Sequence, residues 1–164
     1  MTMDSGQFKN PEDKVAALLA ERGLTIAAAE SCTGGLLSKR LTDVPGASKF
    51  FVGGIVAYSV QAKITLLDVD PVLAEEKGAV SSEVALAMAD GARKKLGADI
   101  GIGITGLAGP YGDGSGLKVG TVFTALATEE VSICECFDLP GSREKIRSDA
   151  AAYALEMITV FLSG

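Results

Sequence analysis

The chain has 164 residues, of which 48% are hydrophobic and 22% are charged, and its formal net charge is −6 at pH 7. This length and apolar content suit one folded domain and exclude a largely disordered chain. The acidic balance argues against a nucleic-acid partner, since phosphate backbones bind clustered lysine and arginine. No apolar run approaches the ~20 residues of a membrane span. We therefore expect a cytoplasmic protein without a membrane partner, and the high apolar fraction predicts a homo-oligomer, a dimer or higher.

The sequence contains no histidine and three cysteines, Cys32, Cys134 and Cys136. The lack of histidine excludes Ser-His and Cys-His mechanisms within one subunit, and zinc sites built on histidine. The cysteines follow neither a disulfide-framework nor a metal-ligand spacing, so we expect reduced, packed side chains and no metal. Any general base must be a lysine, a tyrosine, a carboxylate or water.

The first half of the chain alternates segments of helical and strand character. After a polar stretch, 1–10, expected to be a flexible tail, the expected elements are a helix over 11–22, a strand over 24–29, a helix over 34–41, a strand over 50–58, a helix over 60–67 and a short helix over 71–78. Gly23 is a typical helix stop. Gly53-Gly54 within a strand predicts a bulge or the close approach of another element.

The second half ends in a hairpin and a long helix. The expected elements are a helix over 84–96, a strand over 99–105, a glycine-rich loop over 105–120, strands over 120–128 and 131–139, and a helix over 142–162. Ser81 and Ser142 are expected to cap the two long helices. Three strands separated by helices and closed by a hairpin predict an α/β fold, a mixed sheet with helices on both faces.

In such a sheet, ligands bind beyond the carboxyl ends of the parallel strands. The first three strands end at Glu30-Ser31, Tyr58-Ser59 and Thr105-Gly106. We therefore expect these residues to converge at one edge of the sheet.

The turn Ser31-Cys32-Thr33-Gly34-Gly35 joins a buried strand to a helix. Free backbone N–H groups at a helix start suit an anion or a developing oxyanion, and glycines allow its close approach. A hydroxyl at this junction can face a ligand. The alternative is that Ser31 or Thr33 caps the helix, as serine and threonine often do.

Lys63 lies on the first turn of the helix that follows the second strand. A partly desolvated lysine has a lowered pKa and can act as a base, and Ser-Lys pairs are an established substitute for Ser-His. Tyr58 could then relay the proton or orient the amine. The alternatives are a solvated helix lysine and a strand-end tyrosine with its hydroxyl in water.

Two further features allow more than one interpretation. The loop over 105–120 has the glycine content of a phosphate-binding loop but matches neither of the common fingerprints, and a flexible lid is an equal alternative. Arg143 and Arg147 share one face near the start of the last helix, where arginine opposes the helix dipole. They either bind a ligand anion or form surface ion pairs with Glu144 or Asp149.

Five motifs spread over the chain carry a family resemblance. They are Ala29-Glu30-Ser31-Cys32-Thr33-Gly34-Gly35, Gly54-Ile55-Val56-Ala57-Tyr58-Ser59 with Lys63, Gly78-Ala79-Val80-Ser81, Thr105-Gly106-Leu107-Ala108-Gly109-Pro110 and Val119-Gly120-Thr121-Val122. Together they resemble the C-terminal domain of the CinA (competence/damage-inducible) proteins, from about Val15 onward. That family includes stand-alone nicotinamide-nucleotide amidohydrolases, also called NMN deamidases. After Pro110 the chain reads Tyr-Gly-Asp-Gly-Ser-Gly, in a region where the family is variable.

The resemblance implies one amidohydrolase domain over 1–164, with an α/β/α architecture and a five-stranded sheet of order 2-1-3-4-5 whose fourth strand is antiparallel. It implies hydrolysis of a small nucleotide, nicotinamide mononucleotide, to nicotinate mononucleotide and ammonia in pyridine nucleotide salvage, with no cofactor and no metal. The implied catalytic residues are Ser31 as nucleophile, Lys63 as base, and Tyr58. The implied substrate-binding residues are Glu30, Cys32, Thr33, Gly34, Thr105, Gly106, Arg143 and Arg147. The rival functions are a non-catalytic nucleotide-binding module of the same fold and a structural subunit.

Overall fold

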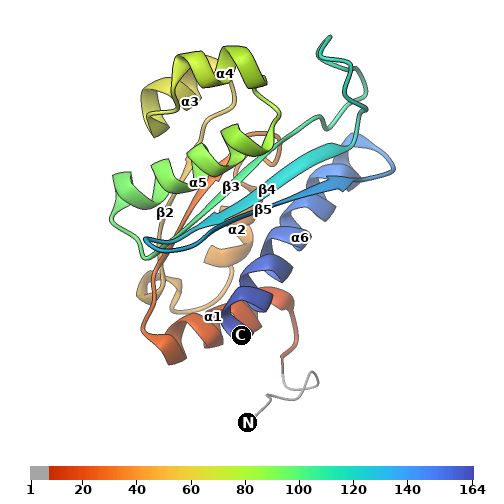
Figure 1. The fold of residues 1–164 in the computed structure, drawn as a ribbon. Coiled ribbons are helices and arrows are strands. Elements are labelled where there is room, and N and C mark those ends of the chain that lie inside the picture. The colour runs from red at the N-terminus through yellow and green to blue at the C-terminus, as the bar shows by residue number, and fades with distance from the viewer. Residues whose placement is uncertain (1–7) are drawn as a thin grey trace.

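The computed structural model describes residues 8–164, and the first seven residues of the expected tail lie outside that range. The elements are α1 (Pro11–Arg22), β1 (Ile26–Glu30), α2 (Leu36–Thr42), the 3-10 turn η1 (Ala47–Lys49), β2 (Phe51–Val56), α3 (Val60–Leu67), α4 (Pro71–Lys77), α5 (Ser82–Leu96), β3 (Ile100–Gly106), β4 (Thr121–Ala127), β5 (Ser132–Asp138) and α6 (Arg143–Ser163) (Figure 1). Every element expected from the sequence is present, with bounds that move by no more than two residues at an end. Ser81 and Ser142 cap α5 and α6 as predicted.

The five strands form one mixed sheet in the order β2-β1-β3-β4-β5. β1 is parallel to both β2 and β3, whereas β4 is antiparallel to β3 and to β5. The predicted α/β class, strand order and antiparallel fourth strand are therefore confirmed. Within residues 8–164, no helix is both long enough and apolar enough to cross a bilayer.

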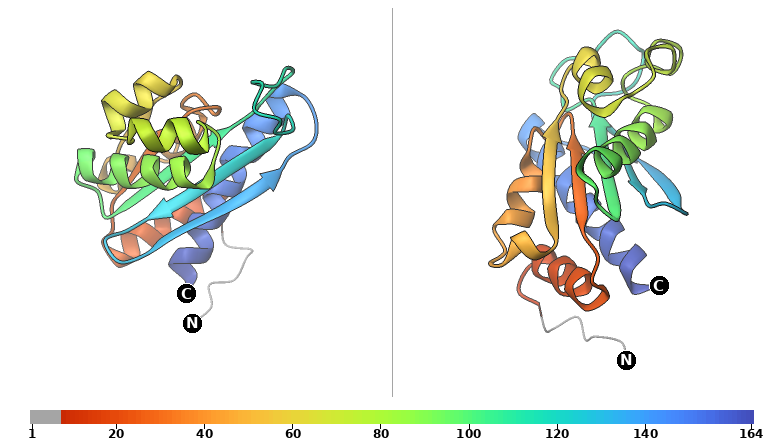
Figure 2. Two further views of the ribbon diagram at one scale, coloured as in Figure 1. Left: turned by 45° about the horizontal axis from the view of Figure 1, so that its top comes forward. Right: turned by 90° about the vertical axis from the view of Figure 1, so that its left-hand side faces the viewer.

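Helices cover both faces of the sheet (Figure 2). Successive side chains of β1 point to opposite sides, because side chains alternate along a strand. Ile26 and Ala28 join a core with α1, α2 and α6, whereas Ala27 and Ala29 join a second core with α3, α4 and α5. The two faces of the sheet are thus buried between two helical layers. The ends of its strands are not covered by these layers.

Glycines in the strands mark places where another element comes very close. A Cβ atom added to Gly54 would clash with Ser38 Oγ on α2, and the β1–β2 register shifts where Ile26 and Ala27 pair with Phe51 and Gly53. The bulge and close approach predicted at Gly53-Gly54 are both observed. The contact matters for the site, because Ser38 also binds Glu30, the last residue of β1.

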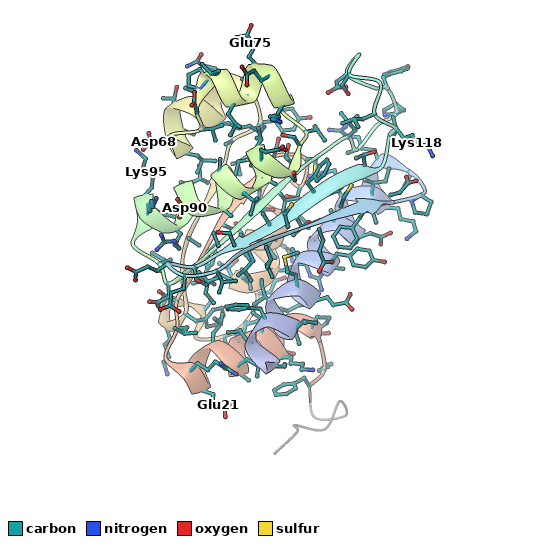
Figure 3. All side chains as sticks on the ribbon, viewed as in Figure 1. Glu21, Asp68, Glu75, Asp90, Lys95 and Lys118 are labelled. Carbon is teal, nitrogen blue, oxygen red and sulfur yellow. The ribbon has the colours of Figure 1, made fainter. Side chains whose placement is uncertain are left out.

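The surface carries most of the charge, as Figure 3 shows for the labelled side chains. Asp68, at the end of α3, pairs with Lys95 of α5 at 2.6 Å, while Glu75 on α4 is exposed. The three cysteines are free. Cys32 is buried and Cys134 partly buried, but Cys136 is exposed, so the expected packing role is wrong for Cys136 because β5 is an edge strand.

Candidate active site

The carboxyl ends of β1, β2 and β3 surround a cavity of about 260 Å³. Its lining includes Ser31, Cys32, Tyr58, Lys63, Thr105 and Arg143. Ser31 directly follows β1, and its N–H donates to the carbonyl of Ile104 on β3 at 3.0 Å, which fixes the serine at the sheet edge. The predicted convergence of the three strand ends is therefore observed.

The Lys63 amine lies beside the Ser31 hydroxyl. Lys63 Nζ donates to Ser31 Oγ at 2.8 Å and to the carbonyls of Ala57 and Tyr58 at 3.0 and 3.1 Å, and only 1% of the residue is exposed. This burial excludes the alternative of a solvated helix lysine. In the neutral amine, the two carbonyls can take both N–H groups, which leaves the nitrogen lone pair facing Ser31 Oγ.

Burial lowers the pKa of Lys63 from 10.5 to about 8, because the charged ammonium loses its hydration. Within residues 8–164, no carboxylate forms an ion pair with this amine. A substantial fraction of Lys63 is therefore neutral near physiological pH, and the neutral form is the one that can accept a proton.

We expect the wild type to become more stable relative to Lys63→Met between about pH 8 and pH 10.5. In this window the unfolded chain still binds a proton at Lys63 while the folded protein has released it, so unfolding takes up a proton. Raising the pH then opposes unfolding. The measurement is the melting temperature of both proteins across this window. A difference between them that does not change with pH would contradict the lowered pKa.

The turn after Ser31 is held by Arg147 rather than by a helix cap. Gly34 has a φ of 57°, which favours glycine, and an added Cβ would lie 3.2 Å from Arg147 Nη2. Arg147 donates from Nε to the carbonyl of Cys32 at 3.0 Å and from Nη2 to that of Thr33 at 3.1 Å. Arg147 is not among the residues that line the cavity, and its guanidinium fixes the turn. Its expected role in substrate binding stays a prediction.

Neither Ser31 nor Thr33 caps α2. The N-cap residue is Gly35, which offers no side-chain acceptor, and the Thr33 hydroxyl is buried without a hydrogen-bond partner in the described part of the chain. The capping alternative is therefore wrong.

Among residues 8–164, the amides of Cys32 and Thr33 donate to no backbone carbonyl, whereas that of Gly34 donates to Ser31 O at 3.1 Å. Two amide groups next to Ser31 thus lack a backbone acceptor.

Glu30 supplies the missing anchor for α2. Its fully buried carboxylate accepts from Leu37 N at 2.8 Å, Ser38 N at 3.0 Å and Ser38 Oγ at 2.7 Å. The negative charge sits at the helix start, where the helix dipole favours it. The carboxylate is occupied by α2 and is not among the groups that line the cavity, and the substrate-binding role expected for Glu30 stays a prediction.

Replacing Glu30 with alanine should lower the free energy of unfolding by about 2–4 kcal/mol. The change leaves the buried Leu37 amide and the half-buried amide and hydroxyl of Ser38 without their acceptor. Urea unfolding followed by circular dichroism measures the effect, and the exposed Glu75→Ala is the matched control, expected within about 0.5 kcal/mol of the wild type. Equal stabilities for the two variants would show that the carboxylate is not the anchor.

Tyr58 and Arg143 form a second polar pair in the cavity wall. Tyr58 is 61% exposed, and its hydroxyl accepts from Arg143 Nη2 at 3.1 Å. Arg143 Nη1 also donates to the carbonyl of Gly109 at 2.6 Å. In the described residues the Tyr58 hydroxyl makes no hydrogen bond to Ser31 or Lys63, so the geometry does not support the expected proton relay. The Tyr58 backbone carbonyl, rather than its ring, contacts Ser31 and Lys63.

Thr105 and Gly106 form the floor of the cavity at the end of β3. Thr105 Oγ1 donates to the carbonyl of Ala79 at 2.7 Å, which ties β3 to the loop before α5.

Burial raises the pKa of the neighbouring Cys32 thiol to about 11, so the thiol stays neutral and does not compete with Ser31 as a nucleophile. Tyr111 and Asp113 also line the cavity, although the sequence analysis named neither as a site residue and considered only their glycine-rich loop.

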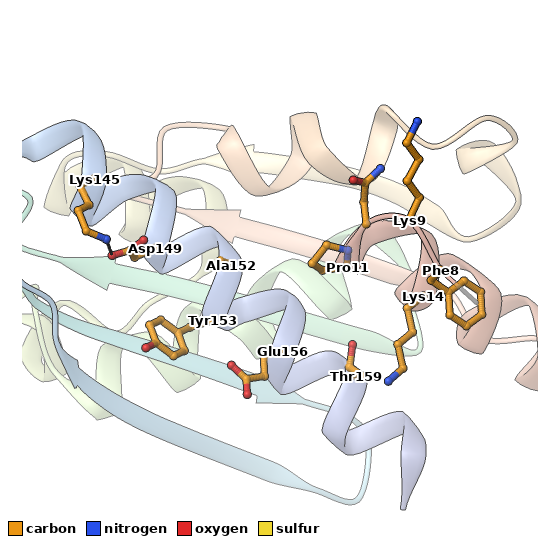
Figure 4. A pocket seen from close by; sticks show the side chains of 11 residues that line it. Phe8, Lys9, Pro11, Lys14, Lys145, Asp149, Ala152, Tyr153, Glu156 and Thr159 are labelled. Atoms are coloured by element: carbon orange, nitrogen blue, oxygen red, sulfur yellow. Dashed lines mark hydrogen bonds and ion pairs between the residues drawn. The ribbon is translucent and has the colours of Figure 1, made fainter. Parts of the chain in front are cut away.

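A larger hollow of about 690 Å³ lies elsewhere, between the start of α1 and the outer face of α6 (Figure 4). Its charged lining residues carry both signs, and Lys145 pairs with Asp149 within it. None of the strand ends reaches it. The strand-end side chains gather instead at the smaller cavity.

A serine hydrogen-bonded to a buried lysine thus lies at the carboxyl edge of the mixed sheet in this α/β protein. Comparison with known families gives the narrower assignment. The family model described as the CinA C-terminal domain matches residues 9–162, and the chain belongs to this family. The resemblance seen in the five sequence motifs is thereby confirmed.

Relatives and solved structures agree with this assignment. The chain is 50% identical to a CinA-like protein of Geotalea daltonii, over 88% of this chain and 35% of the relative, and 48% identical to one of Geobacter sulfurreducens, again over 88% and 35%. It thus spans about a third of the length of these relatives. The crystal structure of competence damage-inducible protein A from Klebsiella pneumoniae superposes with a TM-score of 0.91 at 32% identity, covering 93% of this chain and 94% of that one.

Proposed function

We propose that this protein is an amidohydrolase that converts nicotinamide mononucleotide to nicotinate mononucleotide and ammonia. The observation that carries the proposal is the buried Lys63 amine, 2.8 Å from Ser31 Oγ and held by two backbone carbonyls. A helix lysine that serves only packing or solubility would not be buried in this way, since burial penalises its charge. The family membership and its resemblance to nucleotide amidohydrolases supply the substrate.

In the proposed mechanism, Ser31 Oγ attacks the carboxamide carbon while neutral Lys63 accepts the hydroxyl proton. The carbonyl oxygen becomes an oxyanion, and the free amides of Cys32 and Thr33 are its proposed donors. Lys63 then returns the proton to the leaving nitrogen, the C–N bond breaks and ammonia departs. Water, deprotonated by Lys63, attacks the acyl-serine ester and releases the nicotinate product and the free hydroxyl.

Arg143 is the proposed partner of the substrate phosphate. It is the arginine that lines the cavity, and its guanidinium is held in place by Gly109 O and the Tyr58 hydroxyl. Arginine binds phosphate oxygens through a planar set of donors, which a lysine at this position could not reproduce. The aromatic end of the substrate would then lie toward Ser31.

Ammonia release from nicotinamide mononucleotide tests the function directly. The purified wild type should release one ammonia per nicotinate mononucleotide formed, with the product identified by chromatography. Thermal stabilisation by the nucleotide without ammonia release would instead identify a non-catalytic binding module. Neither binding nor release would refute the proposed substrate.

A further inference from the structure

The loop between β3 and β4 places an aromatic side chain at the rim of the cavity. Tyr111 lines the same cavity as Ser31 and Lys63, yet it is 86% exposed. An aromatic ring in this position gains free energy when a ligand covers it, since the ring has little protein to pack against.

The two ends of this loop are fixed, whereas its tip is free of packing. Leu107 N–H donates to Thr121 O at 2.9 Å, and Gly120 N–H donates to Leu107 O at 2.7 Å. Near the tip, a Cβ atom added to any of three glycines would meet no other atom within 4 Å: Gly112, Gly114 and Gly116. The glycines of the tip that carries Tyr111 therefore have open space around them, whereas the base of the loop is tied to β4.

The cavity is small for a site that encloses a nucleotide. Its volume of about 260 Å³ lies below the range of roughly 300–1,000 Å³ that is usual for sites that enclose small molecules. A mononucleotide bound between Ser31 and Arg143 would remain partly open to water. If the Tyr111 ring folded in from the loop, it would cover part of the mononucleotide that otherwise faces water.

The charges around the cavity favour one orientation of a substrate that carries both signs. Asp113, two residues beyond Tyr111, also lines the cavity, and hydrogen bonds from Ser115 lower the pKa of its carboxyl, which keeps it ionised. Arg143 provides the positive charge from α6. A phosphate at Arg143, with the cationic ring between Ser31 and the side chains of Tyr111 and Asp113, matches this arrangement.

We propose that Tyr111 stacks on the positively charged pyridinium ring of the mononucleotide and favours cationic pyridine carboxamides over neutral amides. The inference rests on the proposed function, because it takes its substrate class from there. The face of a tyrosine ring attracts a cation and also packs against a flat heteroaromatic ring. Tyr111 is a substrate-binding residue that the sequence motifs did not indicate.

The test compares Tyr111→Ala with Tyr111→Phe, and uses Tyr153→Phe as a distant tyrosine control. Tyr153 stacks on Phe137, with ring centroids 4.5 Å apart, and phenylalanine keeps that contact. Dissociation constants are measured by calorimetry in a Ser31→Ala background, so that no turnover is required. The probes are nicotinamide mononucleotide and its dihydro form, which keeps the phosphate and the carboxamide but has a neutral ring.

We expect Tyr111→Ala to weaken binding of nicotinamide mononucleotide about tenfold and binding of the dihydro form by less than about twofold. Tyr111→Phe and Tyr153→Phe should stay within about twofold of the parent protein for both probes. With Ser31 present, Tyr111→Ala should raise KM by the same factor and leave kcat nearly unchanged, because a stacked ring binds ground state and transition state alike.

The binding and turnover measurements separate the two proposals. A tenfold loss confined to the cationic probe supports the role of Tyr111 whether or not ammonia is released. Equal losses for both probes would overturn the selection of the cation, and unchanged affinity in Tyr111→Ala, or no binding to the parent protein, would overturn the whole inference. Wild type that binds but releases no ammonia would contradict the proposed function alone.

Discussion

Replacing Ser31 with alanine should reduce ammonia release by at least about a thousandfold. The hydroxyl is the only proposed attacking group, and the buried neutral thiol of Cys32 is not a substitute for it. The fold should survive, because Ser31 caps no helix and Lys63 keeps its two carbonyl partners at 3.0 and 3.1 Å. Single-turnover ammonia release measures the rate, and urea unfolding measures the stability, expected to change by about 1 kcal/mol.

Ser59→Ala is the matched control for this prediction. Ser59 caps α3, and its Oγ accepts from Ala62 N at 3.0 Å, so its loss should cost about 1 kcal/mol of stability. It leaves the nucleophile in place and should keep most of the activity. The two variants should therefore have similar stabilities but opposite activities. A folded Ser31→Ala protein with most of the wild-type rate would refute the assignment of the nucleophile.

The fold could be predicted from the sequence because local signals agree with the tertiary structure at most positions. α3 is an example: Ser59 caps its start, Asp68 ends it in a left-handed conformation, and its observed bounds match the expected ones. The alternation of isoleucine and glycine in β3 likewise follows from packing. Ile100, Ile102 and Ile104 fill one core, while Cβ atoms on Gly101 and Gly103 would clash with the backbone of α5.

The site was predictable to the level of the sheet edge, but not to the direction of each side chain. Glu30 and Arg147 share the expected region, yet both are occupied by backbone groups of the turn and of α2. Arg143 and Arg147 lie one turn apart on the same helix, so spacing cannot decide which of them reaches the cavity. Tyr58 shows the same limit, because its carbonyl and not its hydroxyl contacts Lys63.

Lys63→Arg should be nearly as inactive as Lys63→Met, although arginine keeps the positive charge. Guanidinium stays protonated at every working pH and has no lone pair with which to accept the Ser31 proton. We expect both variants to lose at least about a hundredfold in kcat, the contribution usual for a positioned general base. Substantial activity in Lys63→Arg would mean that the residue acts as a fixed charge for the substrate and not as a base.

The same assignment fixes the pH dependence of the wild type. Because the neutral amine is the active form, kcat/KM should rise with pH through an apparent pKa of about 8 and level off above it. Below that value each pH unit should lower the rate about tenfold, since the neutral fraction falls by that factor. Ser59→Ala should show the same limb, as its change lies outside the Ser–Lys pair. The profile is measured by ammonia release over the range in which circular dichroism shows the fold to be intact.

If single-turnover kinetics show that chemistry limits the rate and the profile is still flat between pH 6 and pH 9, no group with the pKa of Lys63 accepts the proton. Lys63 would then position Ser31 through its hydrogen bond, and the base would have to be water.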